Sequence, residues 1–257
     1  MGLHFFRGFC ILALRYPGFS REQKSLATRT WSRHLLTVLA IELRTSGNPP
    51  EPDPRNTLLV SNHISWLDII ALASCSGTRF IAKKEIHHWP FIGWMAHRGG
   101  TLFIDRTNRR DASRVNQQMA DALRSGDCLT VFPEGTTSTG LALLPFKSSL
   151  FESAVLADST VQPVTIRYLN EHGQHTSAPS YAGQTTVWQS LGRLLRLRKM
   201  VVELHYGAPL HAGHEPYLTR FELAEAARHQ IAHELKPVLD KPDTVAKISV
   251  CPPVAAQ

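Results

Sequence analysis

Cysteine is scarce in this chain, which has only four cysteines in 257 residues. They are Cys10, Cys75, Cys128 and Cys251. No two form a CxxC pair, so the spacing indicates neither a zinc site nor a disulfide framework, and it fits a reducing compartment. The adjacent His87 and His88 have no carboxylate at a ligand spacing. We therefore expect no metal ion.

Long apolar runs are also missing. The runs from Gly8 to Leu14 and from Leu35 to Ile41 are both far shorter than the roughly 20 apolar residues of a membrane-spanning helix. Arg7 and Arg15 interrupt the first 19 residues, and no convincing signal-peptide cleavage site follows them. Both runs suit helices that lie in a bilayer interface, or helices that pack on the rest of the protein.

The chain does not have enough acidic residues to balance its basic ones. It has 28 Lys and Arg against 21 Asp and Glu, a formal net charge of +7. An anionic partner is therefore expected: a lipid surface, a phosphorylated substrate, coenzyme A, an acidic carrier protein or nucleic acid. A hydrophobic content of 43% and a charged content of 19% are typical of a folded protein.

Proline marks the main boundary that we expect in the chain. Four prolines fall within residues 49–54, so residues 47–54 are interpreted as a linker. Before it, residues 1–44 are expected to form two helices, broken at Tyr16-Pro17-Gly18. The predicted division is an amino-terminal pair of helices at 1–47, one domain at 55–240 and an irregular tail at 241–257.

Strand and helix patterns alternate after this linker. Strands are expected at 57–61, 79–82, 101–104, 128–132, 161–166 and 200–206. Helices are expected at 66–75, 88–97, 111–125, 147–157 and 219–235. This alternation predicts an α/β fold with a mixed sheet flanked by helices, preceded by an interfacial segment of two helices.

The most informative motif is NHISWLD at residues 62–68, directly after the apolar run TLLV. It places His63 and Asp68 at the carboxyl end of a predicted strand, where ligands collect in open α/β sheets. A His beside an Asp can take a proton from a hydroxyl. No obvious nucleophile accompanies the pair, so the hydroxyl could belong to a substrate. Alternatively, Ser65 and Asp68 form only a capping box at a helix start.

Two further blocks end predicted strands in polar residues. GTLFIDR ends in Arg106, and Arg109 and Arg110 follow, so this cluster could hold a phosphate or simply begin a solvated basic helix. FPEGTTS contains Glu134 and several hydroxyls, which could bind a polyol or form an ordinary turn. Lys147 adds a cation shortly afterwards.

Two other stretches have ambiguous patterns. VQPVTIR at 161–167 is an apolar strand whose internal Pro163 indicates an edge, a bulge or a bend. The aromatic stretch at residues 86–95 suits acyl chains, a membrane interface or the core.

Taken in order, NHISWLD, GTLFIDR, FPEGTTS and VQPVTIR resemble the motif blocks of the glycerolipid acyltransferases, the 1-acyl-sn-glycerol-3-phosphate acyltransferase family. The family pattern is NHxxxxD, GxxFIxR, FPEGTRS and a VPV-type strand. The match covers residues 57–167. NHISWLD and FPEGT are specific motifs, and they stand in the right order and at the right separation.

The resemblance implies roles for individual residues. His63 would be the general base that deprotonates the acceptor hydroxyl, and Asp68 would orient and stabilise it. Arg106 would bind the acceptor's anion. The remaining predicted substrate-binding residues are Glu134, Gly135, Thr136 and Lys147.

The resemblance also implies a reaction and a place in the cell. A fatty acyl group would pass from acyl-CoA or acyl carrier protein to a lysolipid acceptor in phospholipid biosynthesis, with no metal or bound cofactor. The protein would bind an anionic membrane surface on the cytoplasmic face through its amino-terminal helices, as a peripheral or monotopic protein.

The chain departs from the family pattern at Thr137, where the family often has Arg. Arg109, Arg110 or Lys147 could compensate, or the acceptor could be a lyso-ornithine lipid or another lysolipid. A thioester or lipid hydrolase is less well supported, because water needs no anion-binding cluster. A basic nucleic-acid-binding module is also less well supported, because the aromatic residues cluster with apolar residues and not with basic ones.

Overall fold

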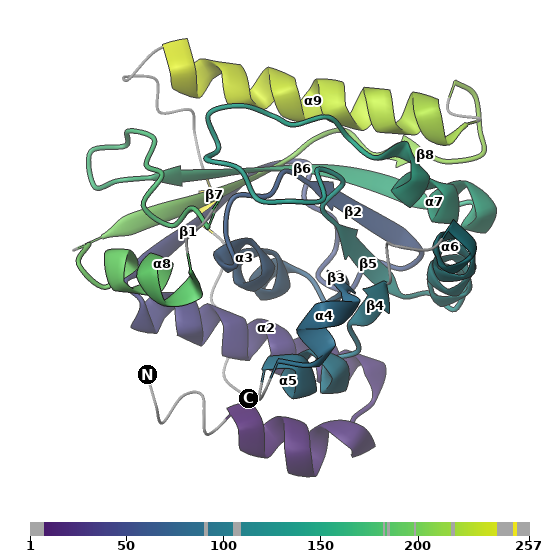
Figure 1. The fold of residues 1–257 in the computed structure, drawn as a ribbon, viewed down its shortest axis with the longest axis horizontal. Helices are drawn as coiled ribbons and strands as arrows, with labels where there is room; N and C mark the ends of the chain where they lie inside the picture. The colour runs from purple at the N-terminus through teal and green to yellow at the C-terminus, as the bar shows by residue number, and fades with distance from the viewer. Residues whose placement is uncertain are drawn as a thin grey trace.

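The computed structural model describes residues 8–89, 92–104, 109–181, 183, 186–197, 199–216, 219–240 and 249–250. Within these ranges the chain forms one nine-stranded sheet with helices on both faces (Figure 1). The predicted α/β class, with a mixed sheet and helices at the amino-terminal end, is confirmed.

The strands of this sheet follow a mostly parallel arrangement. They are β1 (Ile41–Gly47), β2 (Thr57–Ser61), β3 (Thr78–Lys83), β4 (Leu102–Ile104), β5 (Cys128–Val131), β6 (Thr160–Leu169), β7 (Met200–Tyr206), β8 (Leu210–His211) and β9 (Ser249–Val250). Their order is β4-β3-β5-β2-β6-β7-β1-β9, and β8 pairs with β6. All neighbours from β4 to β6 are parallel, whereas β7 is antiparallel to β6. The carboxyl ends of five parallel strands therefore lie at one edge of the sheet.

Helices cover both faces of the sheet in the described part of the chain. They are η1 (Ile11–Arg15), η2 (Tyr16–Gly18), α2 (Arg21–Val38), α3 (Leu67–Cys75), α4 (Lys84–His87), α5 (Ile92–Arg98), α6 (Arg109–Arg124), η3 (Ser148–Phe151), α7 (Glu152–Ala157), α8 (Val187–Leu194) and α9 (Arg220–Asp240). Helices α6, α7 and α9 enclose one hydrophobic core, and α2, α3 and α8 enclose the other.

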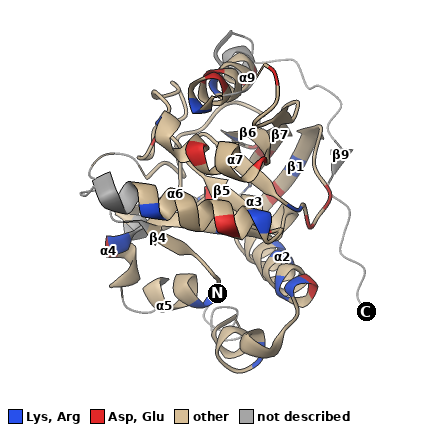
Figure 2. Cartoon of the chain, turned by 90° about the vertical axis from the view of Figure 1, so that its right-hand side faces the viewer, with Lys and Arg blue, Asp and Glu red and all other residues tan. Residues whose placement is uncertain are grey.

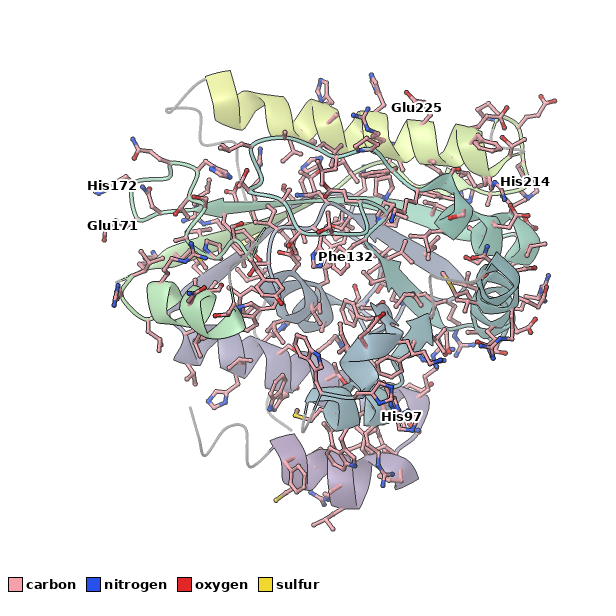
Figure 3. All side chains as sticks on the ribbon, in the orientation of Figure 1. His97, Phe132, Glu171, His172, His214 and Glu225 are labelled. Atoms are coloured by element: carbon pink, nitrogen blue, oxygen red, sulfur yellow. The ribbon has the colours of Figure 1, made fainter. Side chains whose placement is uncertain are left out.

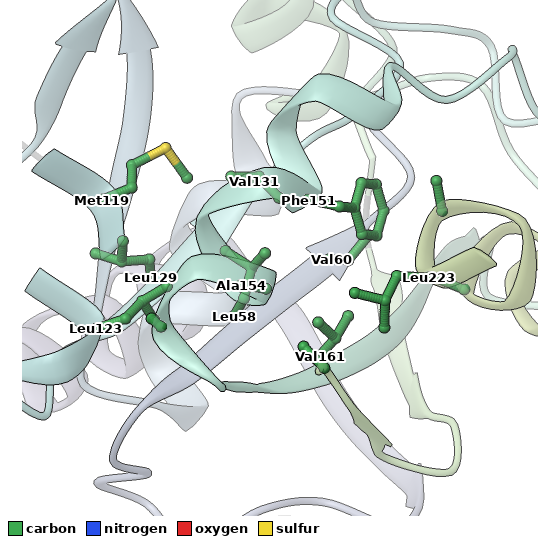
Figure 4. Close-up of a cluster of buried hydrophobic side chains, with 14 of the residues drawn as sticks. Leu58, Val60, Met119, Leu123, Leu129, Val131, Phe151, Ala154, Val161 and Leu223 are labelled. Carbon is green, nitrogen blue, oxygen red and sulfur yellow. The ribbon is translucent and has the colours of Figure 1, made fainter. Parts of the chain in front are cut away.

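Strand β2 contributes to both cores. Leu58 and Val60 pack with Phe151 on one side (Figure 4), and Leu59 packs on the other. Because both faces are covered, the strand is apolar throughout and shows no polar alternation. Burying its side chains fixes β2, and with it the start of the motif that follows.

The expected helices at residues 1–44 are wrong at their carboxyl end. Helix α2 ends at Val38, Ala40 has a φ of 55°, and residues 41–47 form β1, which pairs with β7 along its whole length. Ile41 and Leu43 alternate with charged residues, as a strand with one buried face requires. The helical interpretation overlooked this period of two. The domain division at the linker stays a prediction.

Helix α2 packs on the protein. Leu35 and Leu36 are 1% and 2% exposed and belong to the core around α3. Trp31 also packs inward, and a Cβ added at Gly8 would collide with its indole. Of the two interpretations left open for the run from Leu35, packing on the protein is correct.

Acidic and basic residues lie next to each other on α2 and on α6 (Figure 2).

The other differences from the expected elements are local. The helix expected at 88–97 begins later, as α5 at Ile92, and a short helix that was not expected, α4, precedes it and ends at His87. Neither α8 nor β8 was expected. The tail after residue 240 was expected to be irregular, but Ser249 and Val250 pair with β1, and the rest of it lies outside the described residues.

Pro163 sits at a break in the neighbouring strands. Its carbonyl accepts a hydrogen bond from Gly207, between the end of β7 and the start of β8. The nitrogen and carbonyl of a strand residue point to the same side, so the missing N–H faces this gap. The expectation of an edge-like position is therefore correct locally, although β6 lies inside the sheet.

Candidate active site

The register of the sheet brings two motifs together. Val60 of β2 pairs with Val131 of β5, so the residues that follow the two strands are neighbours. The loop predicted to be catalytic, residues 62–66 between β2 and α3 and called the catalytic loop below, therefore lies beside the FPEG turn, residues 132–135 after β5. Phe132 lies near the middle of the molecule, whereas His172 and His214 lie at its periphery (Figure 3).

His63 and Asp68 form a direct hydrogen bond. Nδ1 of His63 lies 2.7 Å from Oδ2 of Asp68. The Asp68 side chain is completely buried, and that of His63 is 19% exposed. Because the carboxylate accepts from Nδ1, Nε2 is the basic nitrogen of the neutral ring. No described residue hydrogen-bonds to Nε2, so it can take a proton from a substrate.

Asp68 also holds the loop that carries His63. Its Oδ2 accepts hydrogen bonds from the backbone N–H groups of Ile64 at 2.7 Å and Ser65 at 2.9 Å. Its Oδ1 accepts one from the hydroxyl of Tyr168 at 2.6 Å. Four donors thus surround one buried carboxylate, which compensates for its desolvation.

The contacts of Asp68 bear on the capping alternative, whereas the catalytic interpretation stays a prediction. Helix α3 begins at Leu67 and its N-cap is Trp66, so Ser65 does not cap it, but the Ser65 N–H donates to Asp68 in the first turn. The same oxygen binds His63. The start of the helix therefore places the carboxylate where the imidazole can reach it.

Glu134 fixes the backbone of His63 from the neighbouring strand. Its Oε1 accepts a hydrogen bond from the N–H of His63 at 2.7 Å, and its Oε2 accepts one from Leu144 at 3.0 Å. The residue is only 5% exposed, and burial raises the pKa of its carboxyl group. Gly135 follows with a φ of 73°, which favours glycine in this turn.

The ring and carbonyl of His63 are also held. The imidazole stacks on Phe132, with ring centroids 4.0 Å apart and an interplanar angle of 14°. The carbonyl accepts a hydrogen bond from the N–H of Ser138 at 2.8 Å. The ring therefore has one face covered, Nδ1 bound and Nε2 open.

Asn62 joins the catalytic loop to β6. Its side chain donates to the carbonyl of Ile166 at 3.0 Å and accepts from the N–H of Ile166 at 2.8 Å. The side-chain amide thus continues the pairing of β2 with β6 beyond Ser61, where the backbone of β2 turns into the loop.

A loop before α8 packs on the same region. The N–H of Tyr181 donates to the carbonyl of Ile64 at 3.1 Å, and its carbonyl accepts from the hydroxyl of Thr137 at 2.9 Å. Ser180 donates to the carbonyl of Ser138 at 3.0 Å, and its own carbonyl accepts from Arg193 of α8 at 2.7 Å. The hydroxyl at position 137 is therefore engaged by this loop.

The remaining predicted site residues are placed as follows. Thr136 and Lys147 are exposed beside the FPEG turn, and the backbone N–H of Lys147 donates to the carbonyl of Pro133 at 2.9 Å. Arg106 lies outside the described residues, as do the side chains of Arg109 and Arg110. Within the described ranges no group of three His, Cys, Asp or Glu side chains could hold a metal ion.

This arrangement can perform base catalysis on a bound hydroxyl. The site has a histidine with one open nitrogen, a buried carboxylate that orients it, and a rigid loop under both. A cysteine nucleophile is not part of it: Cys128 is buried on β5, and desolvation raises the pKa of its thiol to about 12.

Known proteins are similar to this chain. A model of the acyltransferase family matches residues 42–167. The chain is 35% identical over 218 residues to 1-acyl-sn-glycerol-3-phosphate acyltransferase of Neisseria meningitidis, covering 83% of this chain and 84% of the relative. The chain belongs to this acyltransferase family. The expected family and the expected enzyme class, an acyltransferase, are confirmed.

A second group of relatives has a different name. The acyltransferase is 37% identical over 204 residues to lyso-ornithine lipid O-acyltransferase of Pseudomonas aeruginosa, covering 79% of this chain and 76% of the relative. The crystal structure of the 1-acyl-sn-glycerophosphate acyltransferase of Thermotoga maritima has the same fold, with a TM-score of 0.68 and 21% identity over 93% of this chain and 88% of that one. No helix within the described residues of the acyltransferase is both long and apolar enough to cross a bilayer.

Three residues that shape the site escaped the motif analysis. Tyr168 follows VQPVTIR directly, and its position two residues after the apolar Ile166 on one strand indicates an inward side chain. A buried tyrosine needs a partner for its hydroxyl, but the sequence could not say which. Ser180 and Tyr181 lie in a loop with no motif, and only the folded chain brings them to Ile64 and Ser138.

Proposed function

We propose that this acyltransferase moves a fatty acyl group from a thioester donor to the hydroxyl of a lysophospholipid in phospholipid biosynthesis, with 1-acyl-sn-glycerol-3-phosphate as its acceptor. The hydrogen bond between His63 and Asp68 carries the proposal, because it leaves Nε2 of His63 as an open base. The donor is acyl-CoA or acyl carrier protein. The relatives named as 1-acyl-sn-glycerol-3-phosphate acyltransferases support this acceptor.

The proposed reaction is a direct transfer. Nε2 of His63 takes the proton of the acceptor hydroxyl as its oxygen attacks the thioester carbonyl carbon. The carbon–sulfur bond then breaks, and the leaving thiolate recovers the proton from His63. Asp68 stabilises the imidazolium in between and keeps the ring in the tautomer with the proton on Nδ1. No acyl-enzyme and no metal ion take part in these steps.

Acceptor binding is assigned to the residues around the FPEG turn and to Arg106. Lys147 is a described cation whose backbone is tied to Pro133, so its side chain starts beside this turn. Arg106 follows β4, a member of the parallel set. Gly135 is the last residue of the FPEG turn, and the exposed Thr136 follows it. Glu134 holds the backbone of the site, because its two oxygens accept hydrogen bonds from the N–H groups of His63 and Leu144.

Mass spectrometry of lipid products tests the acceptor. The purified protein is incubated with one acyl thioester and, separately, with 1-acyl-sn-glycerol-3-phosphate, a lyso-ornithine lipid and a neutral monoacylglycerol. The proposal predicts the fastest acylation with the phosphorylated acceptor. Release of free fatty acid at the same rate with and without an acceptor would instead identify a hydrolase.

A lyso-ornithine lipid is the second candidate acceptor. Two observations favour it: the relative from Pseudomonas aeruginosa, and the absence of arginine at position 137. Threonine provides no charge for a phosphate, and the hydroxyl of Thr137 already donates to the carbonyl of Tyr181. Faster acylation of the lyso-ornithine lipid in the same experiment would establish this alternative.

We also propose that the protein binds the cytoplasmic face of an anionic membrane through η1 and α5. These helices lie together at one end of the molecule (Figure 1). The ring of Phe9, just before η1, lies 4.8 Å from the ring of Trp94 on α5. Leu14 is 81% exposed and Trp89 is 41% exposed. The guanidinium of Arg98 lies 5.7 Å from the centre of the Trp94 ring. Aromatic, apolar and basic groups at one surface suit a bilayer interface.

A further inference from the structure

Tyr168 links the central strand β6 to the catalytic carboxylate. Its hydroxyl donates a 2.6 Å hydrogen bond to Oδ1 of Asp68 across 100 residues of sequence, and both side chains are completely buried. The other oxygen of Asp68 binds His63. Tyrosine, carboxylate and imidazole therefore form one continuous chain that ends at the open Nε2.

We propose that Tyr168 is a positioning residue of the acyltransferase, which acts on His63 through Asp68. This inference rests on the proposed role of His63 as the base. The tyrosine directs one carboxylate oxygen to itself, so the other points at Nδ1 and at the backbone N–H groups of Ile64 and Ser65. Its hydrogen bond also withdraws part of the negative charge of Asp68 and thereby tempers the attraction of that carboxylate for the imidazolium.

The tyrosine is suited to this role because it keeps its proton. Burial and the neighbouring negative charge of Asp68 raise the pKa of Tyr168 well above its ordinary value. The hydroxyl is thus a donor throughout the working pH range. Tyr168 pairs with Val202 of β7, and its carbonyl accepts a hydrogen bond from the N–H of Thr176 at 2.9 Å, so the backbone that carries the phenol is held.

Tyr168→Phe tests the proposal, because it removes the hydroxyl and keeps the ring. We expect kcat to fall roughly tenfold, the size of one hydrogen bond to a charged group, with a smaller change in either KM. The acid limb, where kcat/KM falls as the pH decreases, should move to higher pH. Without the tyrosine hydroxyl, the Asp68 carboxylate has one hydrogen-bond donor fewer and stabilises the protonated form of the His63–Asp68 pair more strongly. A purely structural role for the hydroxyl would lower stability without moving that limb.

Two other titratable groups lie close to the loop that carries this pair, and both remain in the variant. Glu134 binds the N–H of His63, and burial raises its pKa. His175 lies across Gly140 from Ile64, and burial lowers its pKa. Their contribution to the pH profile is common to the wild type and Tyr168→Phe, so the difference between the two profiles reports on Tyr168.

The matched control is Tyr206→Phe, which removes a hydroxyl from an equally buried tyrosine of the same core on β7. We expect it to leave kcat and the acid limb unchanged. The decisive measurement adds Tyr168→Phe to an Asp68→Asn background. If Tyr168 acts through Asp68, its loss should reduce the kcat of the Asp68→Asn enzyme by less than about twofold.

The outcomes separate this inference from the proposed function. An equal, additive loss in both backgrounds, or an unmoved acid limb in Tyr168→Phe, would overturn the role of Tyr168. Full activity of His63→Ala would instead overturn the proposed base and leave the inference without a base to position. Thermal unfolding of each variant confirms that the compared proteins are folded.

Discussion

Glu134 holds the backbone of His63, with its Oε1 2.7 Å from the His63 nitrogen. Its second oxygen accepts a hydrogen bond from Leu144. The acid of the FPEG turn thus joins the loops after β5 and β2, and both of its oxygens must accept. A neutral amide at this position would turn one acceptor into a donor that faces an N–H group.

Glu134→Gln should therefore reduce kcat by about tenfold, since one of two charge-assisted hydrogen bonds is lost at the base of the catalytic loop. The KM for the acyl thioester should change little. Steady-state kinetics with each substrate varied would measure both quantities. A rise in the acceptor KM alone would assign Glu134 to the acceptor and not to the loop.

The same variant should also change how stability depends on pH. Burial raises the pKa of Glu134 in the folded protein above its ordinary value of 4.5. The stabilising contribution of the residue is therefore complete below pH 4.5 and is lost as the pH rises through the folded value. Urea unfolding should show that Glu134→Gln gains stability relative to the wild type as the pH increases through the pKa that Glu134 has in the folded protein. A stability difference that does not vary with pH would contradict the argument.

Asn62→Leu should destabilise the protein by at least about 1 kcal/mol, because the N–H and carbonyl of Ile166 would both lose a buried partner. Asn62→Asp is the matched variant, since it can still accept from the N–H of Ile166. We expect chemical unfolding to place its stability between those of the wild type and Asn62→Leu. Equal losses in the two variants would mean that the accepted bond contributes nothing.

Arg106→Ala should weaken use of the acceptor more than use of the donor. A hydrogen bond between charged groups is worth roughly 1.5–3 kcal/mol, or about ten- to a hundredfold in kcat/KM for the acceptor. Arg106→Lys keeps the charge and should recover part of this loss. A defect confined to the acyl thioester would move Arg106 to the donor site.

Leu14→Gln should weaken binding to anionic liposomes, because Leu14 is the most exposed large apolar side chain of the described residues. Phe221→Gln is the control: Phe221 is 61% exposed at the start of α9, which lies at the opposite end of the molecule from η1 (Figure 1). Flotation should fall for the first variant only, and high salt should weaken binding of the wild type. Equal flotation of all three proteins would place the membrane contact elsewhere.

The sequence predicted strands β2 and β7 well because nearly all of their residues are buried. β2 and β7 lie at the predicted residues, since a short apolar run has few alternatives once turns bound it. β1 was missed because it has only one apolar face, and its charged alternate residues resembled the basic residues of the preceding helix. The dipeptide strand β8 is too short to leave a pattern.

The site was predictable only where a motif placed its residues close together. His63 and Asp68 are five residues apart, and the start of α3 brings them into contact. Tyr168, by contrast, reaches Asp68 through the pairing of β6 with β2, and Ser180 reaches Ser138 through a loop. Such long-range contacts depend on the register of the sheet, which no local spacing shows.

The central claim is that His63 is the base for acyl transfer. Its most direct test compares wild-type protein with folded His63→Ala, using one acyl thioester and 1-acyl-sn-glycerol-3-phosphate, and measures the diacylated product. General-base catalysis contributes typically ~10²–10⁴-fold, so we expect turnover to fall at least about a hundredfold while thermal unfolding stays that of a folded protein. Turnover of folded His63→Ala near the wild-type rate would contradict the account.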